Sequence, residues 1–232
     1  MTPSSRIIGP PRSGTNYVKF LIDNNTKIDC GFNVQWWKHA VIPPIMDRTR
    51  KIDDETLSII MVRDTVAQLN SFWNFCQKGR TAISSHADTF SNFLRQPIYM
   101  KPFDGIEYFF DSPLGYLAQF YYAADRYAGP KFFLNLEDVQ ACPGVLFDKL
   151  HASGLLSDPP SPDEFIRPSG YLGRNADKPL TDDGVYEALP THGDPKTSAG
   201  DPTSTMDSQD KSLIVESQAY RIAETVRRKA VQ

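Results

Sequence analysis

The chain has 232 residues, of which 40% are hydrophobic and 23% are charged, as in an ordinary folded globular domain. Its formal net charge of -3 argues against nonspecific nucleic-acid binding, which requires a broadly positive surface. The three cysteines, Cys30, Cys76 and Cys142, are odd in number and widely spaced. They predict neither a metal cluster nor a disulfide framework, and they favour a reducing, cytoplasmic location. The sequence shows no apolar run of a signal peptide or a membrane span, so we expect no membrane anchor.

Four short apolar runs predict the strands of a buried sheet. They cover residues 6–10, 27–34, 57–62 and 131–136. Helical periodicity follows the first run until Asn24 and Asn25, and it follows the third run from Val66 to Trp73. Strands separated by helices indicate βαβ units and a parallel sheet. Ligands of such sheets bind outside the carboxyl ends of the strands, so the loops that follow the strands are the first candidates for chemistry.

The rest of the chain is expected to complete a single domain of residues 1–232. Residues 72–127 are rich in aromatic side chains, which predict a helical core with a minority of rings lining an acceptor pocket. Residues 190–210 are rich in Pro, Thr, Ser, Gly and Asp, a composition typical of a mobile loop. A helix is predicted from Lys211 to Lys229.

A candidate anion-binding loop lies between the first strand and the first helix. The spacing of Gly9 and Gly14 equals that of a Walker A loop, but Thr15 stands in place of the lysine. Asn16 replaces the Mg²⁺ ligand, and the cation is Arg12 instead. Such a loop holds an anion at a helix N-terminus without a metal. The alternative is a strand-to-helix turn that is merely small and polar.

This loop resembles the 5′-phosphosulfate loop of the sulfotransferases that use 3′-phosphoadenosine-5′-phosphosulfate (PAPS). In that family Pro-(Lys/Arg)-Ser-Gly-Thr-Thr is followed by an aromatic or apolar residue. The resemblance implies that PAPS, or its product 3′-phosphoadenosine 5′-phosphate (PAP), is bound by the whole loop: Pro11, Arg12, Ser13, Gly14, Thr15, Asn16 and Tyr17. It further implies that Tyr17 could face the adenine.

A second motif follows the third predicted strand. Arg63 ends the strand and Ser71 comes eight positions later in the next helix, which resembles the family's 3′-phosphate motif. The guanidinium offers a planar fork to a phosphate, and two helical turns bring the serine hydroxyl back to the same side. The alternative is a strand-end arginine paired with Asp64 or another carboxylate.

A third motif, residues 36–40, carries Lys38 and His39 where family members have a lysine and histidine. The resemblance implies that His39 is the general base and that Lys38 and Arg12 stabilise charge on the transferred group. Histidine suits proton transfer because its ordinary pKa lies near neutral pH. A lone histidine is more commonly structural, which is the alternative here.

Three weaker features follow in the family's order. Residues 133–139 resemble a Tyr-Glu-Asp-Leu segment in which Leu136 has replaced the tyrosine, and residues 154–167 resemble the passage before the last motif. A Gly-rich basic loop, implied to close over the 3′-phosphate, contributes Gly173 and Arg174. Which of Arg167, Arg174 and Lys178 reaches that phosphate is left open by the sequence.

The predicted fold is therefore α/β and P-loop-like, with three layers: a central parallel β-sheet flanked by helices, plus a helical acceptor-binding region. The resemblance implies direct in-line transfer of a sulfonyl group from PAPS to a hydroxyl or amine of a small-molecule or glycan acceptor, without a metal. One alternative is a P-loop kinase or NTPase, which the missing lysine and Mg²⁺ ligand disfavour. The other is a nucleotide-binding module without catalysis.

Overall fold

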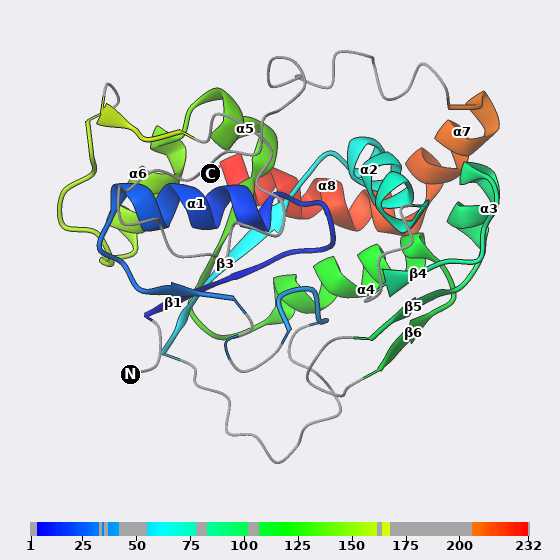
Figure 1. Cartoon of the computed structure of the whole chain (residues 1–232), viewed down its shortest axis with the longest axis horizontal. Helices are drawn as coiled ribbons and strands as arrows, with labels where there is room; N and C mark the ends of the chain where they lie inside the picture. Colours follow the sequence, from blue (N-terminus) through cyan, green and yellow to red (C-terminus); the bar gives the residue numbers. More distant parts are fainter. Residues whose placement is uncertain are drawn as a thin grey trace.

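A parallel sheet of four strands lies at the centre of the molecule, in the order β2-β1-β3-β7 (Figure 1). The computed structural model describes residues 4–32, 34, 37–41, 55–77, 83–101, 107–161, 164–167 and 206–231. The strands are β1 (Ser5–Ile8), β2 (Cys30–Gly31), β3 (Leu57–Val62) and β7 (Lys131–Asn135). Three of the four fall within the predicted apolar runs, and β1 begins one residue before its run, at Ser5. The prediction of a parallel sheet is confirmed.

The second strand is much shorter than the predicted run of residues 27–34. Among the residues that the structure describes, two pairs join it to β1: Ser5 with Cys30 and Arg6 with Gly31. It is an edge strand with a single partner, and a glycine at its end weakens strand formation.

Alternating side chains of the central strands bury both faces of the sheet. Ile7, Ile59 and Leu134 pack on one side in a core shared with α1 (Thr15–Asn25), α5 (Leu136–Ala141) and α6 (Gly144–Ala152). Their sequence neighbours pack on the other side with α2 (Thr65–Gln77), α4 (Pro113–Arg126) and α8 (Gln218–Val231). In Figure 1, α1 and α4 lie on opposite sides of the strands. The predicted arrangement of helices on both faces of a parallel sheet is confirmed.

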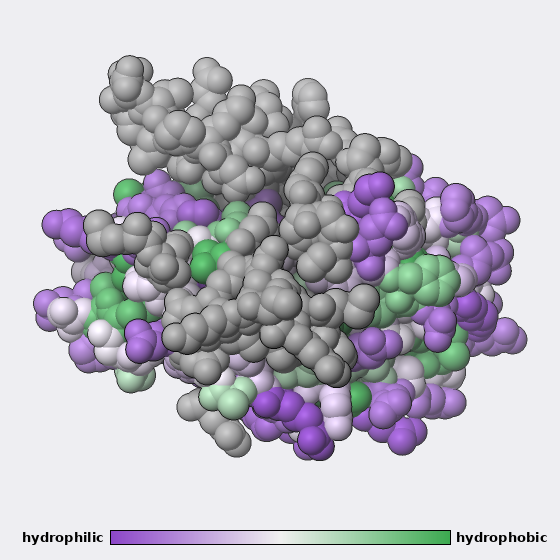
Figure 2. Space-filling view, turned by 90° about the horizontal axis from the view of Figure 1, so that it is seen from below, coloured by the Kyte–Doolittle hydropathy of each residue, from purple (hydrophilic) through white to green (hydrophobic). Residues whose placement is uncertain are grey.

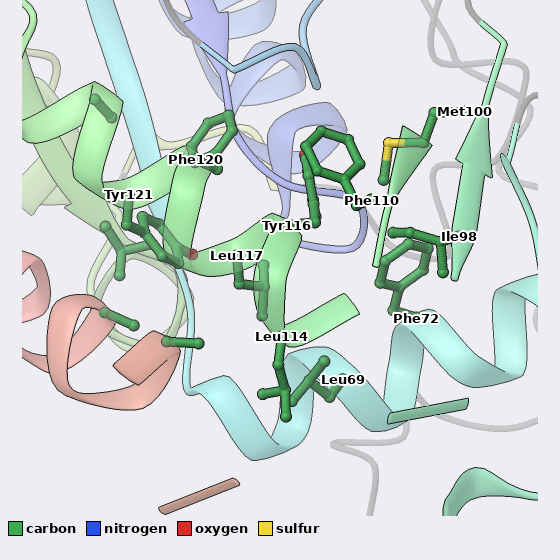
Figure 3. Packing of buried hydrophobic residues seen from close by; sticks show 14 of the residues in the cluster. Leu69, Phe72, Ile98, Met100, Phe110, Leu114, Tyr116, Leu117, Phe120 and Tyr121 are labelled. Carbon is green, nitrogen blue, oxygen red and sulfur yellow. The ribbon is translucent and has the colours of Figure 1, made fainter. Parts of the chain in front are cut away.

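Helix α4 supplies much of the second core. Ser112 caps it by accepting a hydrogen bond from the Gly115 N–H, and Pro113 starts its first turn. Its apolar residues recur at helical spacing, and Figure 3 shows Leu114 of this stripe next to Leu69 of α2. Because the stripe is wide, α4 can contact the sheet, α2 and α8 together.

The aromatic section, residues 72–127, is only partly helical. Besides α3 (Phe90–Arg95) and α4, it contains a three-stranded antiparallel sheet of β4 (Ile83–Ser84), β5 (Ile98–Met100) and β6 (Tyr108–Phe110). In β5, two buried residues flank a half-buried tyrosine, which is the two-residue period of a strand. The expectation of a helical region is therefore wrong at these strands.

The C-terminal helix begins earlier than predicted and is divided. Helix α7 (Ser208–Glu216) precedes α8, and Ser217 between them has extended backbone. The Ser217 hydroxyl accepts the Tyr220 N–H and so caps the start of α8. Most of the loop predicted for residues 190–210 lies outside the described residues, but residues 208–210 belong to α7.

Figure 2 shows one face of the molecule, on which the described surface is mainly hydrophilic with separate hydrophobic areas. In the part of the chain that the structure describes, no helix combines the length and apolar character needed to cross a bilayer.

Candidate anion-binding and catalytic site

The loop between β1 and α1 makes a tight turn at the carboxyl edge of the sheet. The Ser13 N–H donates to the Pro10 carbonyl at 3.1 Å, which places Pro11 and Arg12 at the centre of the turn. Arg12 has φ 68°, a left-handed conformation uncommon outside glycine. Proline followed by a residue of positive φ is the pattern of a type II turn. The left-handed conformation costs about 1–2 kcal/mol for a residue with a Cβ, so contacts to Arg12 must hold it there.

Two glycines in this loop have no room for a side chain. A Cβ on Gly9 would overlap the Ser13 hydroxyl and lie 2.7 Å from the Met61 Cβ. Gly14 has φ 90°, and a Cβ there would overlap the Leu136 side chain. Leu136 therefore packs directly against the loop.

Helix α1 begins at this loop without a side-chain cap. Gly14 is its N-cap residue, and the first turn contains no acidic side chain. The first N–H groups of a helix have no partner within the helix and carry the positive end of its dipole. An anion is therefore favoured at this end of α1.

The structure brings together three of the predicted phosphate-binding residues. The Arg12 Nε donates to the Ser71 hydroxyl at 3.0 Å, and an Arg63 NH group donates to the Arg12 carbonyl at 2.9 Å. The sequence predicts Ser71 beside Arg63, whereas in the structure the Ser71 hydroxyl accepts a hydrogen bond from Arg12. The bond from Arg63 also helps to hold the strained backbone of Arg12. Two cations and a hydroxyl thus converge from β1, β3 and α2.

Arg63 also faces a carboxylate. Its Nε lies 3.7 Å from the Glu137 carboxylate, which also accepts the Asp64 N–H at 3.3 Å. Burial lowers the pKa of Arg63, and Glu137 opposes that shift. The alternative of an arginine paired with a carboxylate is thus realised in part, through Glu137. Asp64 instead caps α2, accepting the Ala67 N–H at 2.8 Å, and lies 3.6 Å from Arg227.

A buried polar chain supports the loop from behind. The Gln68 amide donates to the Pro11 carbonyl at 3.1 Å, and the Tyr121 hydroxyl donates to the Gln68 amide oxygen at 3.1 Å. No motif in the sequence pointed to either residue. A glutamine within an apolar helical stripe was the one available signal for Gln68, because a buried amide requires polar partners.

Further polar groups are buried where the strands end. The side-chain oxygens of Ser13, Thr65 and Asn135 have no hydrogen-bond partner among the described residues. All three residues are at least 95% buried and follow or end β1, β3 and β7. Buried polar groups are usually satisfied, so their concentration at one edge suits a polar ligand.

The segment carrying Lys38 and His39 is joined to the start of the same loop. The Gly9 N–H donates to the Lys38 carbonyl at 2.9 Å, and the Gly9 carbonyl lies 2.6 Å from the His39 Nδ1. A carbonyl only accepts, so Nδ1 carries the proton and Nε2 has the free electron pair. The Lys38 ammonium donates to the Asn16 side chain at 2.8 Å and lies over the Phe32 ring.

Aromatic residues hold His39 from the other side. The buried Tyr116 hydroxyl donates to the His39 carbonyl at 2.7 Å, and the Trp37 ring meets the imidazole edge-on at 5.0 Å. Tyr116 lies 77 positions from His39 in the sequence, and no local pattern pointed to this contact. Figure 3 shows Tyr116 next to Phe110 in the core beside α4.

The surroundings of His39 favour a neutral imidazole. Burial, with the positive charge of Lys38 as the next cause, lowers the pKa of His39 to about 3. The ring is therefore unprotonated at neutral pH, with Nε2 able to accept a proton. Its basicity in the free protein is low, chiefly because the ring is buried, and also because protonation would add a third positive charge near Lys38 and Arg12.

Tyr17 lies in the first turns of α1, where it is partly buried against the core around α5 and α6. Burial raises the pKa of Tyr17, and the positive charge of Arg167 acts in the opposite direction. Arg167 is thus near enough to α1 for its charge to act on Tyr17.

Gly173, Arg174 and Lys178 lie outside the described residues. Among the described residues, no three His, Cys, Asp or Glu side chains are grouped as a metal site would require.

Neither protein-family models nor curated proteins nor solved structures give a match to this chain.

Proposed function

We propose that this protein is a sulfotransferase that moves a sulfonyl group from PAPS to a hydroxyl or amine. The observation that carries the proposal is the convergence of Arg12, Arg63 and Ser71 beside an α1 N-terminus, with a neutral His39 hydrogen-bonded to the same loop. An anion cradle and a base joined through Gly9 suit the transfer of an anionic group. A cytoplasmic location and a P-loop-like relationship belong to the same proposal.

The proposed reaction is a single in-line displacement. The acceptor oxygen attacks sulfur as its proton passes to His39 Nε2, and the bond from sulfur to the phosphate oxygen breaks. The electron pair of that bond leaves on PAP. Arg12 and Lys38 stabilise the negative charge on the sulfonyl and phosphate oxygens, each to about 3 kcal/mol by analogy with oxyanion-hole donors.

Donor binding also makes His39 a better base. Lys38 and Arg12 both lower its pKa through their positive charges. The phosphates and the sulfonate of PAPS would oppose the effect of these two charges, so the pKa of His39 is higher in the complex, although burial still holds it below its ordinary value. The base is then strongest when the donor is in place.

Selective binding of PAP is the first test. PAP at about 100 times its Kd should raise the free energy of unfolding by about 2.7 kcal/mol, if it binds only the folded state. ATP with Mg²⁺ should stabilise the protein much less, because ATP has no 3′-phosphate for Arg63 and Ser71. Thermal unfolding with each nucleotide measures this difference. Equal stabilisation by both nucleotides would contradict the assignment of Arg63 and Ser71 to the 3′-phosphate. A separate experiment, the transfer of labelled sulfonate from PAPS to a panel of acceptors, would identify the acceptor.

The two arginines should differ in kinetics. Arg63→Ala should weaken PAPS binding roughly 10- to 100-fold, with a smaller change in kcat, because it contacts a phosphate that does not react. Arg12→Ala should lower kcat as well, since Arg12 is assigned to stabilise charge on the reacting group. Arg228→Ala, at an exposed position of α8, is the control for general loss of charge. An unchanged KM for PAPS in Arg63→Ala would exclude the proposed division of roles.

A further inference from the structure

Glu137 places a negative charge beside the guanidinium assigned to the 3′-phosphate. Its carboxylate lies 3.7 Å from the Arg63 Nε and accepts the Asp64 N–H at 3.3 Å. That N–H directly precedes α2, whose first residue is Thr65. The carboxylate therefore meets two of the groups that a bound phosphate would use, a guanidinium and the N–H at the entrance of a helix.

The position of Glu137 is fixed by the topology of the sheet. Strands β3 and β7 are adjacent and parallel, with Val62 paired to Asn135. Arg63 follows the first of these residues, and Glu137 lies two positions after the second. The two side chains therefore emerge at the same edge of the sheet, and the carboxylate is 36% exposed and the guanidinium 20%.

Glu137 and Arg63 form a long ion pair in which the Arg63 Nε makes no hydrogen bond to the carboxylate. The Nε is buried and makes no hydrogen bond among the described residues, although its partner is only 3.7 Å away. A partly exposed ion pair of this length contributes little to stability. A more highly charged ligand can therefore displace the carboxylate from Arg63 at small cost.

We propose that Glu137 is an internal anion that stands at the 3′-phosphate position of the free protein and determines how much charge a ligand must carry to bind there. A dianionic phosphate ester competes with the carboxylate for Arg63, whereas a singly charged group such as a sulfate monoester does so poorly. This inference rests on the proposed function, since it takes Arg63 as the 3′-phosphate ligand.

The test compares Glu137→Gln with wild type by calorimetric titration at constant ionic strength. Glutamine keeps an oxygen for the Asp64 N–H and removes the charge. PAP should bind Glu137→Gln roughly tenfold more tightly, because a like charge close to the phosphate is lost. AMP, which lacks the 3′-phosphate, should bind both proteins within about twofold. Inorganic pyrophosphate serves as a multiply charged probe without a nucleoside, and it should also bind Glu137→Gln more tightly than wild type.

Asp138→Asn is the matched control. It removes the same charge from the next position of α5, which projects about 100° round the helix from Glu137. Its affinity for PAP should stay near wild type. If Glu137→Gln does not fold, Glu137→Asp withdraws the carboxylate by one methylene and should also tighten PAP binding, to a smaller extent.

The outcomes separate this inference from the proposed function. Equal PAP affinity in wild type and Glu137→Gln, or weaker binding by the variant, overturns the role of Glu137 while PAP binding itself stands. An equal gain in Asp138→Asn overturns it too, because the effect would then be one of net charge. If no protein binds PAP but Glu137→Gln binds pyrophosphate more tightly, Glu137 still limits anion binding beside Arg63, while the assignment to a 3′-phosphate and the sulfotransferase proposal fail. Binding of neither probe by any variant overturns both.

Discussion

His39→Ala should lower kcat by roughly 10²–10⁴, the usual effect of losing a general base. PAP affinity should remain near wild type, because the imidazole contacts the Gly9 carbonyl and is not assigned to a phosphate. The loss follows from the proton that the acceptor must release as it attacks sulfur. His39→Gln restores bulk and polarity without a usable base, so its kcat should be almost as low. Steady-state kinetics with the identified acceptor and calorimetry with PAP measure the two quantities.

The pH dependence provides a second readout of His39. Its pKa of about 3 in the folded protein lies below the unfolded value near 6.5. The unfolded chain then binds the proton more readily, so His39 contributes stability above pH 6.5 that is lost as the pH falls towards 3. The stability of His39→Gln should fall less over that interval. In kinetics, kcat should show an inflection at higher pH than kcat/KM, because the anionic donor raises the pKa of the base.

A structural role would give a different result. The Trp37 ring and the Tyr116 hydroxyl both contact this residue, so His39 could serve mainly to pack the segment. In that case His39→Ala would unfold at lower temperature while keeping a near-normal kcat. A folded His39→Ala protein with near-normal turnover would refute the mechanism, and the base would then be sought among the carboxylates of the aromatic section, first Asp104, Glu107 and Asp111.

The sheet was predictable because its strands are buried on both faces. Continuous apolar runs such as residues 57–62 have few other stable environments, and the helices between them impose parallel pairing. The small antiparallel sheet was missed for the opposite reason. Strand β5 has only three residues, Ile98–Met100, and its aromatic neighbours fit a helix or a strand equally well. Which one forms depends on pairing with β4 and β6, which no local pattern encodes.

The residues of the candidate site could be predicted in part, but the contacts between them could not. The loop residues and Arg63 were found because glycine spacing and a strand-end arginine are local signals. Their contacts could not be predicted: Ser71 bonds to Arg12 across 59 positions, and Tyr116 reaches the His39 carbonyl across 77. Glu137 lay within a recognised segment, yet its contact with Arg63 depends on β7 being the neighbour of β3. The rule that parallel strands end at one edge would have brought these two residues together once that order was known.

Gly14→Ala should lower the free energy of unfolding by about 2–5 kcal/mol and weaken PAP binding. The left-handed backbone, with φ 90°, costs a residue with a Cβ about 1–2 kcal/mol. The new methyl group would also overlap the Leu136 side chain, and overpacking of this kind costs about 1–3 kcal/mol. Because relief of the overlap must move the loop or α5, the anion cradle should be distorted. Denaturant unfolding and PAP titration measure the two effects.

Gly154→Ala separates the two causes. Gly154 has φ 77°, but a Cβ there would meet no atom within 4 Å. Its cost should be only the backbone part, about 1–2 kcal/mol, with PAP affinity unchanged. In addition, Gly14→Ala combined with Leu136→Ala should be about 1–3 kcal/mol more stable than the sum of the single changes predicts, because the overlap has been removed. Strict additivity, together with equal costs at Gly14 and Gly154, would mean that Leu136 does not restrict the loop and that only the backbone conformation requires glycine.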